Sequence, residues 1–438
     1  MIFVPFIYFT LLTIYWWKTH QGLDLCVYMA GLYALTSLFG IIVVEGNMIG
    51  RTMDDGGILF DNFNLQLSIV PTLLYCAVIT IGLFPFSLIY RKELKTISTP
   101  NPLITYVVSW FLIGVSVINL YLVADSTAEI LSGDLASVRY DHYSGLESPA
   151  EIKAMSMPFI FRFLYYFNIS TLLALPLFFY YVCFEKERAW WFKLLLFFAS
   201  LSVPIAGIQT VDRTEIMFYS MMFISCIILF RNHLSTIVKR IMKIASIPMA
   251  LLALVYIVAV SDARFSKTEG GAETGAVQYA GQNYLNFCYF WEYANYDELA
   301  TERVFPLASH YLLHIDNGEE RRAIRSGQQK FFISVFPSYA GDIMLDLSPI
   351  GLIVWALVML IISLVVVKHS HREELSVGEY LMCFVISVIP IFGIFYYRYM
   401  AFPYTYMILI AVLLYITDKF NIVISRRETN DEEKQIEE

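Results

Sequence analysis

Residues 244–275, IASIPMALLALVYIVAVSDARFSKTEGGAETG, decide the fold class of this chain. The part 244–260 contains no charged side chain, and about 20 apolar residues are needed to cross the hydrocarbon core of a bilayer. Asp262 and Arg264 then follow at once, ahead of a glycine-rich segment. We therefore expect a membrane span that delivers an acid and an arginine to its mouth.

The composition of the whole chain points the same way. Of its 438 residues, 58% are hydrophobic and only 16% are charged, whereas a soluble domain carries roughly a quarter charged residues. Backbone groups inside a bilayer must be hydrogen-bonded within the protein, so such spans form helices. We expect an all-α, polytopic integral membrane protein with the lipid bilayer as its surroundings. No basic patch suits a nucleic acid, and none is expected as a partner.

Apolar windows of the required length recur along the chain and predict about 11 transmembrane helices. The N-terminal window lacks the basic start and small-residue cleavage site of a signal peptide, so we expect it to remain as the first span. The predicted spans are 1–17, 25–44, 66–90, 103–124, 158–184, 190–208, 215–230, 244–261, 350–367, 379–397 and 402–417.

The positive charges of the connecting loops predict the orientation, because cytoplasmic loops carry an excess of Lys and Arg. One set of connections holds 17 such residues, whereas the short connections of the other set hold 5. The first set is 18–24, 91–102, 184–193, 231–243, 368–378 and the tail from 418; the second is 45–65, 125–157, 209–214 and 398–401. The first set is assigned to the cytoplasm, which places the N-terminus outside and the C-terminus inside.

Two predicted outside segments stand out by their length. They are 125–157 and 262–349, and the second has 88 residues, far more than a connection between two helices needs. We expect a single transmembrane domain over 1–418 with these two extracytoplasmic loops, the longer one partly helical. The charged tail 419–438 has no apolar face, and we expect it to be a disordered cytoplasmic end.

Five arginines lie at or just below the predicted outer surface, where the positive-inside rule makes them unexpected. An ionisable group in a span is costly and by default indicates a functional site that faces a cavity. The alternative is that these side chains reach lipid headgroups or pair with nearby carboxylates. A guanidinium binds phosphate oxygens through two parallel hydrogen bonds, so several together suit a pyrophosphate. The five are Arg139, Arg162, Arg213, Arg264 and Arg398.

The longer loop contains a dense run of aromatic residues at 277–297, VQYAGQNYLNFCYFWEYANYD. Such rings can stack on sugar faces while neighbouring polar groups bind hydroxyls; the alternative is an aromatic belt at the membrane interface. Within this run we single out Tyr279 and Glu292. Further along the loop, Arg325 is a candidate contact for a phosphate or a sugar.

Two patterns have the residue types of a metal site. His310 and His314 are spaced to share one helical face, but the Glu and third ligand of a metalloenzyme pattern are missing. A neutral surface pair is favoured, with a general-base histidine as a third interpretation. Asp54 and Asp55 suit a divalent cation on a phosphate, whereas Asp-Asp-Gly-Gly is more typical of a turn. We predict no metal site and no cofactor.

Four local patterns follow one another between residues 133 and 358. The predicted loop 125–157 contains GDLASVRYDHY, and a short outside turn has the sequence VDRTEIMFY. Ten residues separate Arg264 from Gly275, and YAGDIMLDLSPIGLIVWALV leads into a predicted span. In this order and on this topology, they resemble the bacterial O-antigen and capsule repeat-unit polymerases over roughly 125–400. Ser348 and Pro349 stand where that family tends to have glycine.

The resemblance implies an enzyme of the bacterial cytoplasmic (inner) membrane that acts in the biosynthesis of lipopolysaccharide or capsular polysaccharide. Such a membrane glycosyltransferase passes a growing glycan from undecaprenyl diphosphate to a lipid-linked repeat unit at the periplasmic face. Its substrates would be undecaprenyl-diphosphate-linked oligosaccharides, and its partners a flippase and a chain-length regulator of the same pathway. Arginines would replace a metal in stabilising the departing diphosphate.

The resemblance also suggests roles for the residues singled out above. Arg264 would contact the diphosphate, and the base would be Asp262, Glu292 or Glu215, considered in that order. Inversion is the simpler expectation, because one carboxylate acting as base suffices for a single displacement. The expected substrate-binding residues are Arg139, Arg162, Arg213, Tyr279, Arg325 and Arg398.

Three other functions remain open at this point. An O-antigen ligase would have similar parts. A metal-dependent lipid-phosphate-sugar glycosyltransferase would use Asp54 and Asp55. A polysaccharide or lipid-linked-sugar exporter would show paired halves and charges near the midplane, whereas this sequence has one clear intramembrane charge, Arg162, and a very long outside loop.

Overall fold

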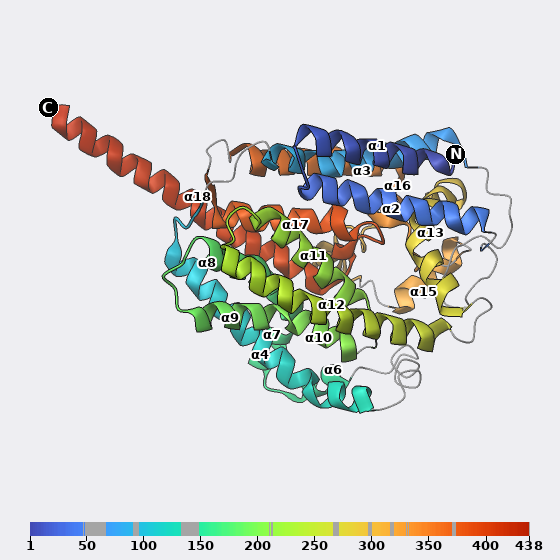
Figure 1. Ribbon diagram of the computed structural model, residues 1–438, viewed down its shortest axis with the longest axis horizontal. Helices are drawn as coiled ribbons and strands as arrows, with labels where there is room; N and C mark the ends of the chain where they lie inside the picture. Colours follow the sequence, from blue (N-terminus) through green and yellow to red (C-terminus); the bar gives the residue numbers. More distant parts are fainter. Residues whose placement is uncertain are drawn as a thin grey trace.

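The computed structural model describes residues 1–46, 48, 67–90, 96–132, 149–209, 211, 213–265, 271–296, 300–315, 319–329, 331, 333–369 and 374–437. It is 82% helical with nearly no sheet, which confirms the all-α class. Most of the long helices run lengthwise beside one another, with α13 and α15 at the end where the chain begins and α18 projecting from the opposite end (Figure 1).

The first half of the chain forms α1 (Phe3–Thr19), α2 (Leu25–Glu45), α3 (Ile69–Tyr90), β1 (Thr96–Ser98), α4 (Pro102–Ser132), α6 (Pro149–Ser156), α7 (Phe159–Tyr165), η1 (Asn168–Leu173), α8 (Ala174–Cys183), α9 (Trp190–Ser200) and α10 (Ser202–Gln209). The second half forms α11 (Thr214–Phe230), α12 (Thr236–Phe265), α13 (Gly271–Tyr293), α14 (Pro306–Leu313), α15 (Glu319–Gln329), α16 (Ser338–His369), β2 (Glu374–Ser376), α17 (Val377–Phe392), η2 (Arg398–Met400) and α18 (Phe402–Glu437).

Several of these helices are suited to a bilayer, as expected of a multi-pass membrane protein. Within the described residues, five helical stretches are long and apolar enough to cross one, and a sixth qualifies if α7 and the η1–α8 helix count as one span bent by 57°. Helices α11 and α17 are apolar but shorter. Each of the eleven predicted ranges overlaps a helix, although 379–397 runs past the end of α17 at Phe392 and 158–184 includes the break between α7 and η1. The number of helices that cross the membrane stays a prediction.

The structure agrees with the expectation of a partly helical long loop and corrects the expectation for the C-terminal tail. Helix α16 begins at Ser338, so the last part of the predicted loop 262–349 is helical and buried. The tail that we expected to be disordered continues α18 to Glu437. Its residues include no Gly or Pro and are rich in Glu, Lys and Arg, which favour a helix.

The loops assigned to the cytoplasm contact one another at one end of the bundle. Strands β1 and β2, which belong to two different loops of this set, pair in parallel. Arg231 donates a hydrogen bond to the carbonyl of Leu23, and Asn101 Nδ2 donates to the carbonyl of Thr417 at 2.6 Å. Segments that the positive charges placed on one side of the membrane therefore lie together in space.

Side-chain caps start two helices at this same end. Asp24 accepts a hydrogen bond from the Val27 amide at 2.8 Å and contacts His20 Nδ1 at 2.5 Å. Ser376 and Glu379 form a reciprocal capping box at the start of α17. Each cap satisfies amides that the first turn of a helix leaves without a partner, so these residues fix where α2 and α17 begin.

At the opposite end, Gly271–Tyr293 of the predicted long loop forms the helix α13. It packs so closely on α2 that a Cβ at Gly281 would lie 2.6 Å from the carbonyl carbon of Phe39. The Tyr284 hydroxyl lies 2.6 Å from Thr72 Oγ1 of α3. Tyr284, Phe287 and Phe290 are buried in the core, and Tyr289 and Trp291 pack partly buried against it, which accounts for much of this aromatic density without a bound sugar.

Candidate functional site

Four residues that the sequence singled out come together at this end of the bundle. Arg213 and Glu215 lie at the start of α11, Tyr279 in α13, and Arg398 in η2. Direct contacts join them into one group, which we call the arginine–tyrosine cluster. Its members are Arg213, Glu215, Tyr279, Phe336, Tyr396, Arg398 and Tyr404.

Arg398 lies at the centre of the arginine–tyrosine cluster and is only 5% exposed. Its guanidinium forms an ion pair with Glu215 and donates a hydrogen bond to the Tyr396 hydroxyl. The Tyr404 hydroxyl donates to the Glu215 carboxylate, with distances of 2.6 and 2.5 Å to its two oxygens. A buried charge needs partners of this kind, so these contacts explain how the protein holds a cation here.

Aromatic rings complete the surroundings of the two arginines. The Arg398 guanidinium carbon lies 3.9 Å from the ring centroid of Tyr404, and that of Arg213 lies 4.8 Å from the ring centroid of Tyr279. Tyr279 packs edge-on against Phe336, which stacks on Tyr396. Cation–π contacts use the face of a guanidinium, while its N–H groups point outward in the plane of the group.

The chain between α17 and η2 carries Arg398 and is held by backbone contacts. The amides of Ser338 and Tyr339, at the start of α16, donate to the carbonyls of Phe395 and Gly393, both at 2.9 Å. Asn283 Nδ2 of α13 donates to the carbonyl of Ile394 at 2.8 Å. The first amides of a helix have no partner within it, so α16 uses them to position this segment.

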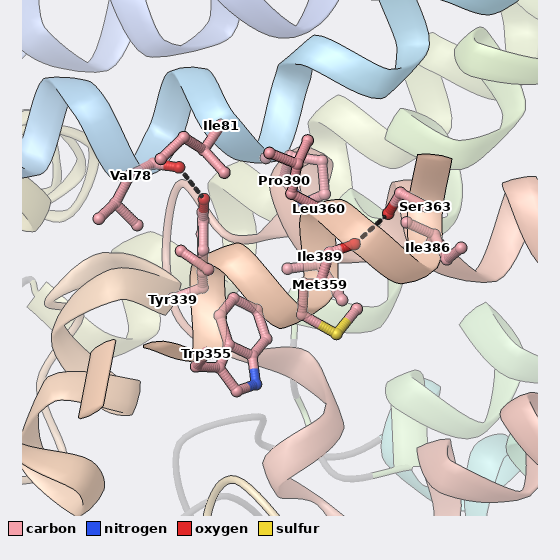
Figure 2. Close-up of a pocket in the computed structure, with 12 residues that line it drawn as sticks. Val78, Ile81, Tyr339, Trp355, Met359, Leu360, Ser363, Ile386, Ile389 and Pro390 are labelled. Carbon is pink, nitrogen blue, oxygen red and sulfur yellow. Dashed lines mark hydrogen bonds between the residues drawn. The ribbon is translucent and has the colours of Figure 1, made fainter. Parts of the chain in front are cut away.

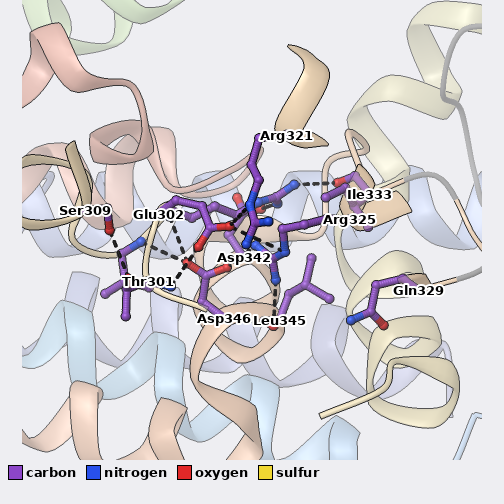
Figure 3. A network of polar contacts seen from close by, with 12 residues as sticks. Thr301, Glu302, Ser309, Arg321, Arg325, Gln329, Ile333, Asp342, Leu345 and Asp346 are labelled. Carbon is purple, nitrogen blue, oxygen red and sulfur yellow. Dashed lines mark hydrogen bonds and ion pairs between the residues drawn. The ribbon is translucent and has the colours of Figure 1, made fainter. Parts of the chain in front are cut away.

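A second group of charged side chains lies next to the same segment and is shown in Figure 3. It contains three cations and three anions, and sequence reasoning missed most of them. We call it the ion-pair network; its members are Glu302, Arg303, Arg321, Arg325, Asp342 and Asp346. The signal that could have found it is the spacing of the two aspartates in YAGDIMLDL, four residues apart on one face of a helix.

Two aspartates of α16 organise the ion-pair network. Asp346 accepts a hydrogen bond from Arg325 Nη1 at 2.6 Å, and from the amides of Arg303 and Val304 at 2.8 and 3.2 Å. Asp342 pairs with Arg303 through one oxygen and accepts from the Tyr397 amide through the other, at 2.8 Å. Asp342 therefore links the ion-pair network to the residue that precedes Arg398.

Glu302 lies outside the apolar helices and is 2% exposed. Burial alone would raise the pKa of its carboxyl group, but the hydrogen bonds from Arg321 and from backbone amides, with the nearby charge of Arg325, outweigh burial and lower that pKa. The distance from Arg321 Nε to the carboxylate is 2.7 Å. Glu302 is thus held as a carboxylate by its partners.

The structure places three other predicted residues away from the arginine–tyrosine cluster. Arg325 is 4% exposed and bonds to Asp346 and to the Leu345 carbonyl in the ion-pair network. Glu292 is exposed near the last turn of α13, about 20 Å along the helix from Tyr279 at 1.5 Å per residue. Arg162 lies in α7, before the bend of that span, and is half-buried.

The remaining predicted residues lie outside the part of the chain that the structure describes. These are Arg139, Asp54 and Asp55, together with the side chains of Asp262 and Arg264. The backbone at the last two is helical, because α12 continues to Phe265. The mouth of the predicted span is therefore the last turn of a helix.

The predicted histidine pair does not share a helical face. His310 lies in α14, and its ring packs against that of Phe402 with the ring centroids 4.8 Å apart. His314 ends that helix in the left-handed conformation, with φ of 54°, and is exposed. Among the described residues, no three His, Cys, Asp or Glu side chains are grouped in the manner of metal ligands.

An apolar cavity lies between α3, α16 and α17, with an empty volume of about 320 Å³ that is partly open to the surroundings. Figure 2 shows Tyr339 in its wall, donating a hydrogen bond to the Val78 carbonyl at 3.0 Å. Trp355, in the same wall, packs against Tyr397 with ring centroids 5.8 Å apart. The cavity wall thus contacts the segment that carries Arg398.

Comparison of the chain with family models, with curated proteins and with solved structures finds no match. Chemical interpretation of the arginine–tyrosine cluster therefore rests on its own geometry. Two guanidinium groups with fixed orientation, beside a carboxylate and three tyrosines, are suited to binding an anionic oxygen-rich group and to stabilising negative charge that develops on it.

Proposed function

We propose that this protein is a glycosyltransferase that polymerises oligosaccharide units carried on undecaprenyl diphosphate, at the outer face of a bacterial cytoplasmic membrane. The observation that supports this most directly is the convergence of Arg213 and Arg398 with Tyr279. The three come from chain segments that are far apart in sequence, and the sequence assigns all of these segments to the outside.

The contacts between loops support the proposed sidedness. Loops with many positive charges contact one another at one end of the bundle, as β1 and β2 do. The arginine–tyrosine cluster joins segments of the opposite set. With the N-terminus outside, about eleven spans would place the cluster at the periplasmic ends of α11 and α18.

In the proposed reaction, a sugar hydroxyl of one lipid-linked unit attacks the anomeric carbon of the glycan on a second lipid carrier. The bond from that carbon to the diphosphate oxygen breaks, and the diphosphate leaves with the electron pair. A carboxylate accepts the proton of the hydroxyl. Arg213 and Arg398 stabilise the charge that develops on the diphosphate, since bidentate guanidinium contacts are among the strongest that phosphate oxygens make.

The contacts of Glu215 suggest a supporting role for this carboxylate. It accepts hydrogen bonds from Tyr404 and pairs with Arg398, so in this scheme it holds the arginine in place. Asp262, at the end of α12, remains the first choice for the base. Tyr279 is packed between Arg213 and Phe336, and we assign it to orienting Arg213.

The direct test uses the purified full-length protein in proteoliposomes, with a fluorescent oligosaccharide on undecaprenyl diphosphate as the only substrate. Polymerase activity gives a ladder of products. A product of one fixed size on a lipid or protein acceptor indicates a ligase, and unchanged substrate that has crossed the bilayer indicates an exporter. The proposal is wrong if the ladder does not appear.

A matched pair of arginine variants ties the activity to the arginine–tyrosine cluster. Arg213 and Arg188 both lie over a tyrosine ring, at 4.8 and 4.9 Å, but Arg188 belongs to a predicted cytoplasmic loop. Arg213→Ala should abolish the ladder, and Arg188→Ala should leave it intact. In cells, the loss of Arg213 should leave single repeat units on the surface.

A further inference from the structure

We propose that Asp342 is a positioning residue for Arg398. This inference rests on the proposed function of the arginine–tyrosine cluster, and it explains what the ion-pair network beside that cluster does. The path from carboxylate to guanidinium is short, because Asp342 binds the backbone amide of Tyr397 and Arg398 is the next residue.

The two oxygens of Asp342 have different partners. One accepts a hydrogen bond from the Tyr397 amide at 2.8 Å, and the other pairs with Arg303 Nη1. The side chain is 1% exposed and lies in the first half of α16. Since α16 also holds the carbonyls of Gly393 and Phe395 through its first amides, one rigid helix fixes the segment that leads into Arg398 at three points.

Arg303 is itself held on several sides. Its Nη2 donates to the carbonyl of Ile333 at 3.1 Å, and its backbone amide donates to Asp346 at 2.8 Å. Its Nε has no hydrogen-bond partner among the described residues, although the side chain is 2% exposed. Taking a guanidinium and a carboxylate out of water costs free energy that their mutual attraction often does not recover, so the buried pair of Arg303 and Asp342 is not explained by stability alone.

This cost argues that the ion-pair network has a purpose other than stability. Replacing a buried ion pair by apolar residues of similar size is often neutral or stabilising. The charges of the network are balanced, three cations against three anions, and Arg303, Arg325, Asp342 and Asp346 are almost fully buried. Such a group is poorly suited to binding a ligand but well suited to holding the backbone in one geometry. An arginine that binds substrate needs its guanidinium placed to within about 0.5 Å of the productive position.

The test compares two double variants that each remove one cation and one anion from the ion-pair network. Asp342→Leu with Arg303→Gln removes that ion pair together with the side-chain acceptor for the Tyr397 amide. Glu302→Gln with Arg321→Gln is the matched control, because that pair contacts neither the arginine–tyrosine cluster nor the segment 393–398. Both proteins are assayed for ladder formation in proteoliposomes, with kcat and KM measured separately, and for exchange of the backbone amides of 393–400 by mass spectrometry.

The first variant should lower kcat by about 100-fold, the size expected of a misplacement near 1 Å, with a smaller change in KM and with faster exchange in 393–400. The control should change kcat by less than about threefold and leave that exchange unaltered. In an Arg398→Lys background, which should keep measurable activity, the Asp342 and Arg303 substitutions should lower kcat by much less than 100-fold, because they act through Arg398.

The outcomes separate this inference from the proposed function. If Arg398→Ala abolishes the ladder while the two double variants behave alike, the positioning role is wrong and the proposed function stands. If Arg398→Ala forms the ladder at the wild-type rate, the proposed role of the cluster is wrong. Should the Asp342 variant not fold, the wild-type protein decides: rapid exchange of the Tyr397 amide, compared with amides of α17, contradicts the inference.

Discussion

Arg398→Lys distinguishes a guanidinium role at position 398 from a role for positive charge alone. Lysine keeps the charge that faces Glu215, and its aliphatic stem can fill most of the same space. It lacks the planar fork with which Arg398 contacts Glu215 and Tyr396 at once. We expect the variant to fold and to lose activity, since a bidentate phosphate contact would become a single one.

The size of the loss follows from the contacts. A hydrogen bond to a charged group contributes about 1.5–3 kcal/mol, and the guanidinium also loses its position 3.9 Å from the Tyr404 ring centroid. Some of this is recovered, because the lysine ammonium still pairs with Glu215, which is 16% exposed on its side chain. A net loss of about 2 kcal/mol corresponds to roughly a 30-fold decrease in kcat/KM.

The measurement is the initial rate of ladder formation at several concentrations of lipid-linked unit. Arg188→Lys is the control, because Arg188 also lies over a tyrosine ring, but at the opposite end of the bundle. Size-exclusion profile and melting temperature establish that each variant is folded. If folded Arg398→Lys retained the wild-type kcat/KM, the bidentate contact would be refuted.

Three further predictions concern packing, pH and the aromatic support of Arg213. Gly281→Ala should lower the melting temperature by several degrees, because its Cβ would meet the backbone of α2 at 2.6 Å; Gly31→Ala, with open space at its Cβ, should not. Because the pKa of Glu302 is lowered in the folded protein, its contribution to stability is present above the ordinary value near 4.5 and is lost as the pH falls through the lowered pKa. The fall in melting temperature between about pH 5 and pH 3 should therefore be smaller in Glu302→Gln, and an equal fall contradicts the assignment. Tyr279→Leu should lower kcat by about tenfold through loss of the cation–π contact with Arg213, whereas Tyr279→Phe should not, and equal rates for the two would remove Tyr279 from the site.

Hydropathy predicted the positions of the helices well and their ends poorly. Every predicted span overlaps a helix, because in a bilayer only a helix satisfies its own backbone. Helix α16 starts earlier than its apolar window since Ser338–Leu347 is buried by protein contacts that hydropathy does not register. The break at Ser348, with φ of 69° just before Pro349, was visible only as a departure from the pattern of the resembling family.

The longest loop shows why composition alone did not predict the site. Its aromatic run suggested rings that stack on a sugar or form a belt at the membrane interface, whereas Gly271–Tyr293 forms the helix α13, which packs on α2. Small residues such as Gly281 mark a close helix contact as readily as they mark a hinge. Arg213 and Arg398 were singled out because they are charges at the predicted outer ends of spans, and that physical reason did identify residues that meet. Glu215, named as the third candidate base, lies between them in the same cluster.

Charge pattern alone did not separate the residues of the arginine–tyrosine cluster from those that support it. Arg325 and Arg398 looked equivalent in the sequence, since both are arginines in outside segments. In the structure Arg325 is bonded to Asp346 and to a backbone carbonyl within a balanced set of buried charges. Arg398 is also buried and pairs with Glu215, but its guanidinium lies among aromatic rings, in one cluster with a second arginine, Arg213. The two arginines differ in their partners, and the partner of Arg325 could not be recognised in the sequence, because Asp346 lies 21 residues further along the chain. The sequence gives the position of each charged residue along the chain, whereas its partner depends on the fold. The positions of Asp342 and Asp346 in α16 therefore distinguish the supporting arginines from the arginines that we propose bind substrate.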